Sequence, residues 1–305
     1  MENHGTHNAL ADDRNERVLI SVNGELFPRP EAKISVFDSG FLVGDGAWEG
    51  MRVHEGKIAF CEDHLERLEE AAAAISLDLG LTRTELIERI HEVLRANEMV
   101  DDVHVRLMVT RGNKKTPSQD PRLALWGPNI VIIAEHKTVA PRTYQEGVSL
   151  FTSTVRRGSP DGLDPRLNCH SKLHEVIALN QALAAGADEA LMLDVRGFVS
   201  TCNATNFFIV KKGELWTSTG RYCMNGITRA KVIDSARAAG WTVHEKDFSL
   251  YDVYSSEEAF VTGTFGGLTP VTTIDGKKIG TGEAPWPQTE QLRKYYQEAL
   301  QNSLR

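Results

Sequence analysis

One lysine in the stretch DPRLNCHSKLHEVIALNQA (residues 164–182) is placed where its amine could do covalent chemistry. Lys172 stands just before an apolar run with helical spacing, so it lies at or near the start of a helix. An amine that is partly removed from water loses its proton more easily and then attacks carbonyl compounds. The alternative is an ordinary solvated charge in the first helical turn. The residues alone leave both open.

Two further segments could bind an anion. The sequence NGITRAKV places Gly226 and Thr228 at a helix start, where free backbone N–H groups and the helix dipole favour a phosphate. Thr228 is expected to be the N-cap of this helix. The segment TGTFGG (262–267) follows a strand, and its glycines let backbone amides approach a ligand closely. Each motif is also compatible with a plain capped helix or a plain turn, but together they indicate one phosphate-bearing ligand.

A countercharge for that ligand could come from Arg67, in the segment HLERL. A solvated helix arginine is the alternative. Thr264 in the second loop could add a hydroxyl.

The elements that must position these residues fall into two groups. The first begins with RVLISVNGELFP, a hairpin with the turn dipeptide Asn23-Gly24. Two adjacent helices follow, one in CEDHLERLEEAAAAISLDLG and one in TRTELIERIHEVLRANEM, the second opened by the capping-box pair Thr82 and Glu85. The segments DVHVRLMVTRG and NIVIIAEH are typical of buried strands.

The second group starts with the strand VSLFTSTV and the helix after Lys172. It continues with strands separated by glycine turns, the helix TRAKVIDSARAAG, and a C-terminal helix from Thr289. We therefore expect an α+β protein with four parts: a flexible tail (1–16), a small domain (17–138), a linker (139–145) and a large domain (146–305).

Composition narrows the class of protein. The net charge is −8 in 305 residues, which argues against a nucleic-acid or anionic-membrane partner. No apolar run approaches the roughly 18–20 residues that span a bilayer, and the polar N-terminus does not resemble a signal peptide. The four cysteines form no CxxC pair, so we expect neither a metal site nor disulfides, and a cytoplasmic location.

Several motifs, in this order, resemble the class IV aminotransferases, the fold type IV enzymes that use pyridoxal 5'-phosphate (PLP). They are GDGAWEGMRVHEGKIAFCEDHLERL, ADEALMLDVRGFVS, NGITR, EEAFVTGT and TPV followed by IDG and IG. The resemblance implies a small N-terminal α/β domain, a larger C-terminal pseudo-barrel α/β domain, PLP in the cleft between them, and a homodimer.

The resemblance also implies roles for particular residues. It gives the PLP phosphate to the positions of Arg67, Ile227, Thr228 and Thr264, beside Gly226 at the helix start. The backbone amides of Phe265 and Gly266 would face the substrate carboxylate.

Two positions depart from the family pattern. Asn168 stands where the family has the lysine that forms a Schiff base with PLP, and an amide cannot do so. Lys172 falls where branched-chain enzymes often carry a tyrosine, and we expect it to be a relocated Schiff-base lysine, one helical turn or about 5.4 Å further on. Thr201 replaces the glutamate that usually pairs with the pyridine nitrogen, which weakens the electron sink.

The function implied is an aminotransferase for an amino acid and a 2-oxo acid, similar to branched-chain aminotransferases. The altered positions keep two alternatives open: a PLP-dependent lyase, racemase or elimination enzyme, and a homologue that binds PLP or another phosphorylated ligand without a covalent bond. For the substrate side, Arg106 matches an arginine of many branched-chain members. Trp48 and Phe41 could line the pocket, or could be core residues.

Overall fold

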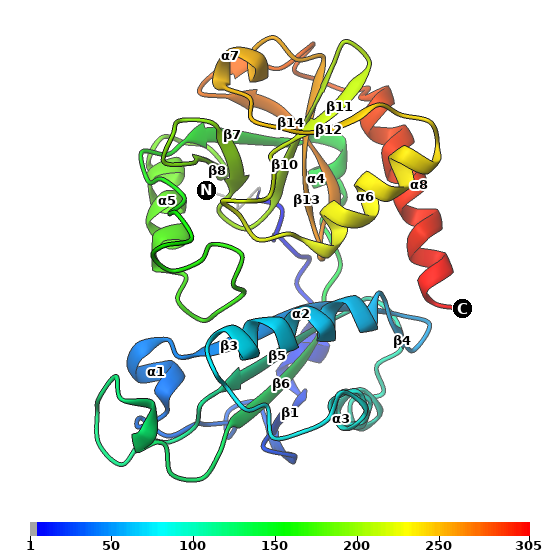
Figure 1. Cartoon of the computed structure of the whole chain (residues 1–305). Coiled ribbons are helices and arrows are strands. Elements are labelled where there is room, and N and C mark those ends of the chain that lie inside the picture. Colours follow the sequence, from blue (N-terminus) through cyan, green and yellow to red (C-terminus); the bar gives the residue numbers. More distant parts are fainter. Residues whose placement is uncertain (1–4) are drawn as a thin grey trace.

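Two β-sheets, one in each half of the chain, organise the computed structural model, which describes residues 5–305 (Figure 1). The first sheet has six strands in the order β2-β1-β6-β5-β3-β4, and all its neighbours are antiparallel. Its strands are β1 (Leu19–Val22), β2 (Glu25–Pro28), β3 (Gly46–His54), β4 (Lys57–Ile58), β5 (Val103–Thr110) and β6 (Asn129–His136).

Local sequence signals explain most of this lobe. Asn23 and Gly24 both have positive φ, as the turn between β1 and β2 requires. Helices α2 (Cys61–Ala74) and α3 (Arg83–Ala96) bury their apolar stripes in the same core as β5, and the predicted capping box opens α3. The short helix α1 (Ser39–Val43) precedes β3. A 3-10 turn, η2 (Pro121–Leu123), lies in the loop between β5 and β6.

The second sheet has nine strands, with β15 paired to β14 beside the path β12-β11-β10-β13-β14-β7-β8-β9. They are β7 (Val148–Thr152), β8 (Glu189–Leu193), β9 (Val199–Cys202), β10 (Asn206–Lys211), β11 (Glu214–Thr217), β12 (Val243–Glu245), β13 (Glu258–Gly263), β14 (Gly267–Ile274) and β15 (Lys277–Lys278). Because β9 ends the path yet runs by a short turn into β10, the sheet curls toward a barrel.

Helices cover this curled sheet from outside. Helices α6 (Ile227–Ala238) and α8 (Pro287–Ser303) share one core with β10 and β13, and α5 (Leu173–Ala184) packs its alanines on β8 (Figure 1). The short helix α7 (Leu250–Val253) lies before β13.

The segments between the lobes differ from expectation. Most of the expected linker forms the short helix α4 (Pro141–Glu146). Residues 1–4 lie outside the described part, but residues 5–16 do not form a free tail. They include the turn η1 (Asp13–Glu16), and Thr6 is buried. A polar composition alone did not reveal these contacts, because they are made with segments distant in sequence.

Within residues 5–305, no helix combines the length and the apolar composition that crossing a bilayer requires. The same residues contain no cluster of His, Cys, Asp or Glu side chains arranged to hold a metal ion.

Candidate active site

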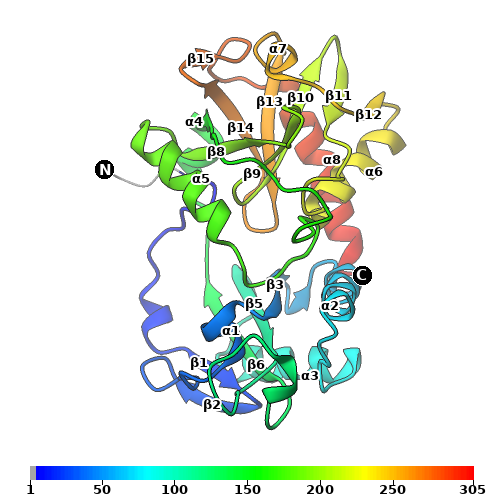
Figure 2. The ribbon, with the colours of Figure 1, turned by 60° about the vertical axis from the view of Figure 1, so that its left-hand side comes forward.

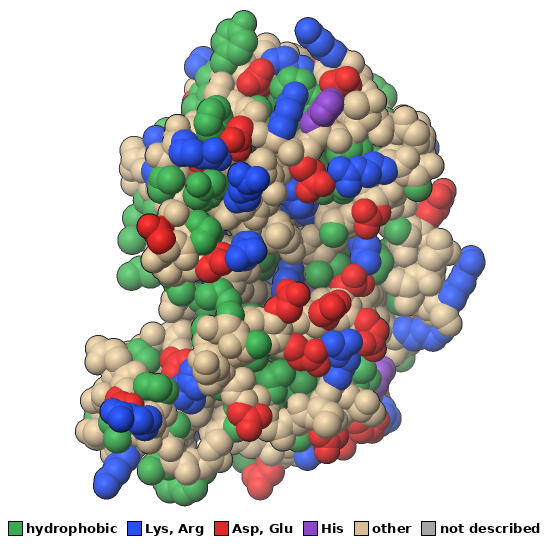
Figure 3. Space-filling model, in the orientation of Figure 1, with side chains coloured by type: hydrophobic (Ala, Val, Ile, Leu, Met, Phe, Trp, Pro, Cys, Tyr) green, Lys and Arg blue, Asp and Glu red, His purple; other side chains and the backbone are tan. Residues whose placement is uncertain are grey.

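A cavity of about 360 Å³ is lined by residues of both lobes. The small lobe contributes side chains of β3, α2 and β5, and the large lobe contributes the starts of α5 and α6 and the turns after β9 and β13. Figure 3 shows the surface indented between the lobes. The cavity size is that of a small-molecule or cofactor site.

All but two of the residues predicted for the site line this cavity. Those that do are Lys172, Asn168, Arg67, Thr201, Gly226, Ile227, Thr228, Thr264, Trp48, Arg106 and Phe265. Phe41 does not. It lies on α1 with 70% of its surface exposed. The prediction that Phe41 lines the substrate pocket is therefore wrong within a single chain. Gly266 follows the lining residues but is not one of them.

The segment before α5 crosses to the small lobe and pairs with β3. Trp48 N donates to Asn168 O at 3.0 Å, and His170 N donates to Gly46 O at 3.0 Å. Residues 168–171 are therefore not helical, and Lys172 is the N-cap of α5. The expected one-turn helical step from Asn168 to Lys172 is wrong, because backbone pairing with β3 holds this segment outside the helix.

Lys172 presents its amine at the cavity wall. Its Nζ lies 5.9 Å from the centre of the Trp48 ring, and 28% of the side chain is exposed. Burial lowers the pKa of Lys172, and the nearby Glu175 carboxylate only partly opposes this shift. The amine is therefore deprotonated more readily than that of a solvated lysine, as a nucleophile requires.

Glu175 is a site residue that the sequence analysis missed. Its Oε1 lies 3.9 Å from Lys172 Nζ and accepts a 2.5 Å hydrogen bond from Arg157 Nη1. Its Oε2 lies 3.2 Å from His174 Nδ1, but the geometry of this contact is not that of a hydrogen bond. It is the single carboxylate among the lining residues described. The sequence signal that could have identified Glu175 is its i,i+3 spacing from Lys172, which places both side chains on one helix face.

Asn168 is buried, and only one of its two side-chain polar atoms has a hydrogen-bond partner. Its amide nitrogen donates to Trp48 O at 2.6 Å, whereas its Oδ1 has no hydrogen-bond partner within residues 5–305. A buried acceptor without a donor is costly unless a partner joins it.

The part of the cavity expected to bind an anion lies at the start of α6. Gly226 is the N-cap, so Thr228 is the second helical residue and its prediction as N-cap is wrong. A Cβ on Gly226 would lie 2.3 Å from Asn206 Oδ1, which explains the glycine. The free amides at this helix start and the Thr228 hydroxyl lie beside the cavity, where an anion is favoured.

Arg67 reaches the same end from α2. Its Nε and Nη2 donate to the two oxygens of Glu49 at 2.8 and 2.6 Å, and its Nη1 donates to Asn225 O at 3.2 Å. A guanidinium has five N–H donors, so two remain for a ligand. Glu49 is buried and also contacts His64. Burial raises the pKa of Glu49, but Arg67 and His64 outweigh it and hold that pKa below its usual value.

Thr201 lies in the cavity wall with its hydroxyl engaged. Its Oγ1 donates to Thr205 O at 2.8 Å and accepts from Asn206 Nδ2 at 3.3 Å. The hydroxyl hydrogen is therefore used within the protein, and donating it to a ligand would require this bond to break.

The small lobe forms the opposite wall. The Arg106 guanidinium lies 3.7 Å from the Trp48 ring centre, a cation–π contact. Burial lowers the pKa of Arg106, and no carboxylate within residues 5–305 forms an ion pair with it. Phe265 closes the far end of the cavity and is itself buried.

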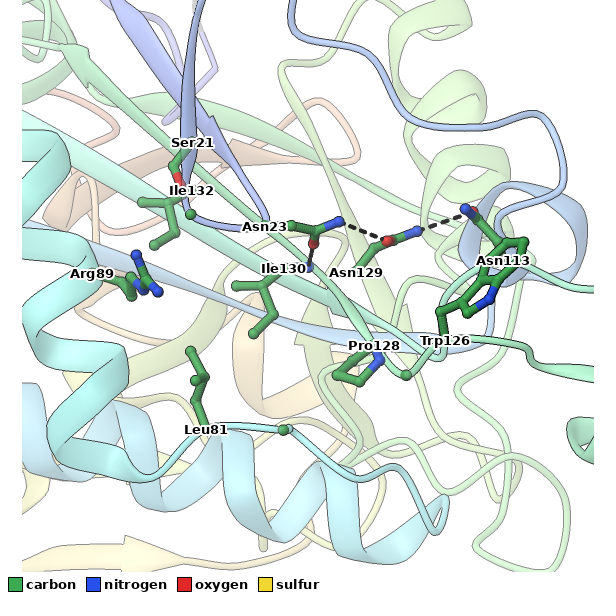
Figure 4. A pocket seen from close by; sticks show the side chains of 13 residues that line it. Ser21, Asn23, Leu81, Arg89, Asn113, Trp126, Pro128, Asn129, Ile130 and Ile132 are labelled. Atoms are coloured by element: carbon green, nitrogen blue, oxygen red, sulfur yellow. Dashed lines mark hydrogen bonds between the residues drawn. The ribbon is translucent and has the colours of Figure 1, made fainter.

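A larger pocket of about 540 Å³ lies elsewhere on the small lobe (Figure 4). Its polar side chains satisfy one another: Asn23 Nδ2 donates to Asn129 Oδ1, and Asn129 Nδ2 donates to Asn113 Oδ1. Its single charged lining residue is Arg89. Among the described residues that line it there is no amine and no free helix start, so the cavity between the lobes is the candidate site.

Comparisons with known proteins identify relatives of the whole chain. A family model described as amino-transferase class IV matches residues 46–274. A putative branched-chain-amino-acid aminotransferase of Methanocaldococcus jannaschii is 39% identical over 85% of this chain and 89% of its own length. A D-alanine aminotransferase of Listeria monocytogenes is 32% identical over 92% of this chain and 96% of its own length.

Other relatives are longer. Branched-chain-amino-acid aminotransferase-like protein 2 of Arabidopsis thaliana is 39% identical over 97% of this chain, but the chain spans only 52% of that protein. Among solved structures, the branched-chain amino acid aminotransferase of Thermobaculum terrenum in its PLP form superimposes with a TM-score of 0.83 and 26% identity. The match covers 95% of this chain and 95% of that chain.

Proposed function

Since this chain belongs to the class IV aminotransferases, we propose that it uses PLP to transfer an amino group between an amino acid and a 2-oxo acid. The observation that carries the proposal is one cavity holding both an anion-binding helix start and the Lys172 amine, whose pKa is depressed. When bound, PLP supplies an aldehyde that accepts amines and a ring that withdraws electrons from the amino acid.

The anion-binding end fits the PLP phosphate. The two free N–H groups of Arg67, the amides at Ile227 and Thr228, and the Thr228 and Thr264 hydroxyls are donors suited to phosphate oxygens. These groups come from both lobes, so a bound phosphate would also tie the lobes together.

Lys172 is proposed as the residue that forms the covalent link to the cofactor and later moves a proton on its Nζ. Glu175, 3.9 Å away, holds the amine in place. Arg157 shares that carboxylate, which limits how strongly Glu175 favours the protonated amine.

Asn168 and Thr201 are proposed as cofactor contacts with altered roles. The free Oδ1 of Asn168 can accept a hydrogen bond from the ring hydroxyl of PLP. Thr201 offers an acceptor oxygen, but no carboxylate, to the ring nitrogen.

The proposed substrates are an amino acid and a 2-oxo acid, and both branched-chain amino acids and D-alanine are named for relatives. We expect the purified protein to take up PLP and to transfer the amino group of a branched-chain amino acid or of D-alanine to a 2-oxo acid. Mass spectrometry of the new amino acid measures this transfer. Release of ammonia, or racemisation without transfer, would instead identify the lyase or racemase alternative. Absence of PLP uptake would refute the proposal.

A homodimer is also proposed, because one side of the molecule exposes apolar side chains near the cavity. They lie just before α1, on α1, on α5 and in the loop before β6, and are Phe37, Phe41, Val43, Trp126, Leu173, Val176 and Ile177. Figure 3 shows such side chains along the edge of both lobes. Val176 also lines the cavity, so a second copy would border the site.

We expect sedimentation velocity to give a dimer, and Phe41→Asp to weaken its association by at least about tenfold, since a charge would replace an apolar interface residue. The matched control is Tyr251→Asp, which changes a residue 82% exposed on α7 and should leave the dimer intact. A fully active monomer would contradict the proposal.

A further inference from the structure

The N-terminal arm, residues 5–10, lies along the segment that joins the two lobes. Leu10 N donates to Thr138 O at 3.0 Å, and Ala9 forms an antiparallel bridge with Val139. In Figure 2 this dark-blue stretch runs along the side of the molecule from the lower lobe to the upper one. The arm therefore has a defined path that ends beside the cavity.

A buried carboxylate anchors the arm to the large lobe. Thr6 is buried, and both its backbone N, at 2.9 Å, and its hydroxyl donate to Glu189 Oε1. The other oxygen of Glu189 accepts a 3.0 Å bond from Thr205 Oγ1 in the turn after β9. Hydrogen bonds to a charged group are stronger than those between neutral groups, so the anchor holds the arm against the cavity wall.

The anchored arm places His7 at one end of the cavity. The His7 ring centre lies 6.4 Å from that of Phe265, and the His104 ring meets Phe265 edge-on at 6.0 Å. Lys137 Nζ lies 4.6 Å from the Phe265 ring centre. All four residues line the cavity. Segments far apart in sequence thus meet around one phenyl ring.

This end of the cavity carries positive charge, which the Glu135 carboxylate, itself 3.7 Å from Arg29, offsets only in part. Arg52 is paired with Asp102 at 3.6 Å, but Lys137 has no ion pair or side-chain hydrogen bond within residues 5–305. Burial lowers the pKa of His7, so its ring is neutral. Its Nδ1 lies 3.2 Å from Thr6 Oγ1, whose hydrogen is donated to Glu189, so Nδ1 carries the ring proton and donates it to Thr6. The Phe265 ring is a cation–π partner for Lys137, but a half-buried ammonium with no hydrogen-bond acceptor still gains from an anion that joins it.

We propose that the N-terminal arm completes a carboxylate-binding subsite, in which Lys137 supplies the charge and the His7 ring, held by Thr6, closes the cavity beside it. The ligand is a carboxylate of the substrate, either the one next to the amino group or one on the side chain. The inference rests on the proposed function, because the subsite opens into the cavity assigned to PLP and substrate. It adds two specificity residues from outside the family motifs.

The test is calorimetric binding of two carboxylic acids to the PLP-loaded protein: 4-methylpentanoate, with one carboxylate, and glutarate, with two. We expect Lys137→Gln to weaken binding by at least about tenfold, the scale of one charged hydrogen bond, and His7→Ala by about threefold. If both acids bind more weakly, the subsite binds the carboxylate that the two acids share. If only glutarate binds more weakly, the subsite binds a side-chain carboxylate. Unchanged affinities for both acids would overturn the proposal.

Two further variants test the role of the arm. Thr6→Val removes the hydroxyl donor to Glu189 without changing any charge. It should weaken the binding of the same acids whose binding His7→Ala weakens. Lys33→Gln removes an exposed lysine and should change neither affinity. The PLP absorbance of each protein is recorded first. Failure of the wild type to bind PLP refutes the proposed function, whereas PLP binding with unchanged acid affinities refutes only the subsite.

Discussion

The Lys172→Ala variant is expected to bind PLP without a covalent link and to lose turnover by about a thousandfold, within the range for removal of a general acid–base group. The physical reason is the position of the amine in the cavity wall with a lowered pKa. Borohydride reduction followed by peptide mapping should find the pyridoxyl group on Lys172 in the wild type and nowhere in the variant. A small primary amine added to the variant should restore part of the turnover.

The matched control is Asn168→Ala, which should retain the covalent link because the amide has no nucleophilic nitrogen. Lys137 is a second cavity amine, and mapping of the pyridoxyl group to it would contradict the assignment. If the wild type forms no link but Asn168→Lys does, the protein is a family member without lysine catalysis, and the aminotransferase proposal fails.

The Arg67→Ala variant is expected to bind PLP at least about tenfold more weakly, because up to two charge-assisted hydrogen bonds to the phosphate are lost. Arg67→Lys keeps the charge but lacks the planar guanidinium that Glu49 holds in place. Its affinity for PLP should therefore lie between those of the wild type and Arg67→Ala. Equilibrium titration followed by cofactor absorbance measures each affinity.

Stability must be separated from affinity in this series, since Arg67→Ala leaves the buried Glu49 with His64 as its remaining partner. The double variant Arg67→Ala/Glu49→Gln removes the buried charge as well, and its PLP affinity should remain low. Arg166→Ala, which removes an exposed arginine paired with Asp164, should bind PLP like the wild type. An unchanged affinity in Arg67→Ala would show that Arg67 does not bind the phosphate.

Local signals determined much of the fold. The Asn23-Gly24 turn, the capping box at Thr82 and the helices α2, α3 and α6 follow from turn chemistry, capping and hydrophobic periodicity. These features depend on residues within one or two turns of each other, so a single sequence contains them. The family motifs then supplied the order of the elements and the α+β class, which the comparisons confirm.

The helix start at Gly226 was also predictable, because a glycine before a helix start is a local pattern, and anion binding there stays a prediction. That Asn168 and Thr201 depart from the family pattern stays a prediction, since it rests on the residue types alone.

Only the tertiary structure decided how the remaining groups meet. Pairing with β3 keeps residues 168–171 extended and makes Lys172 an N-cap, so a helical turn does not separate it from Asn168. Arg157 reaches Glu175 only through the fold, and Thr6 reaches Glu189 across 183 positions in the chain. Such contacts depend on how two sheets pack and on which buried charges find partners, and neither is contained in local periodicity.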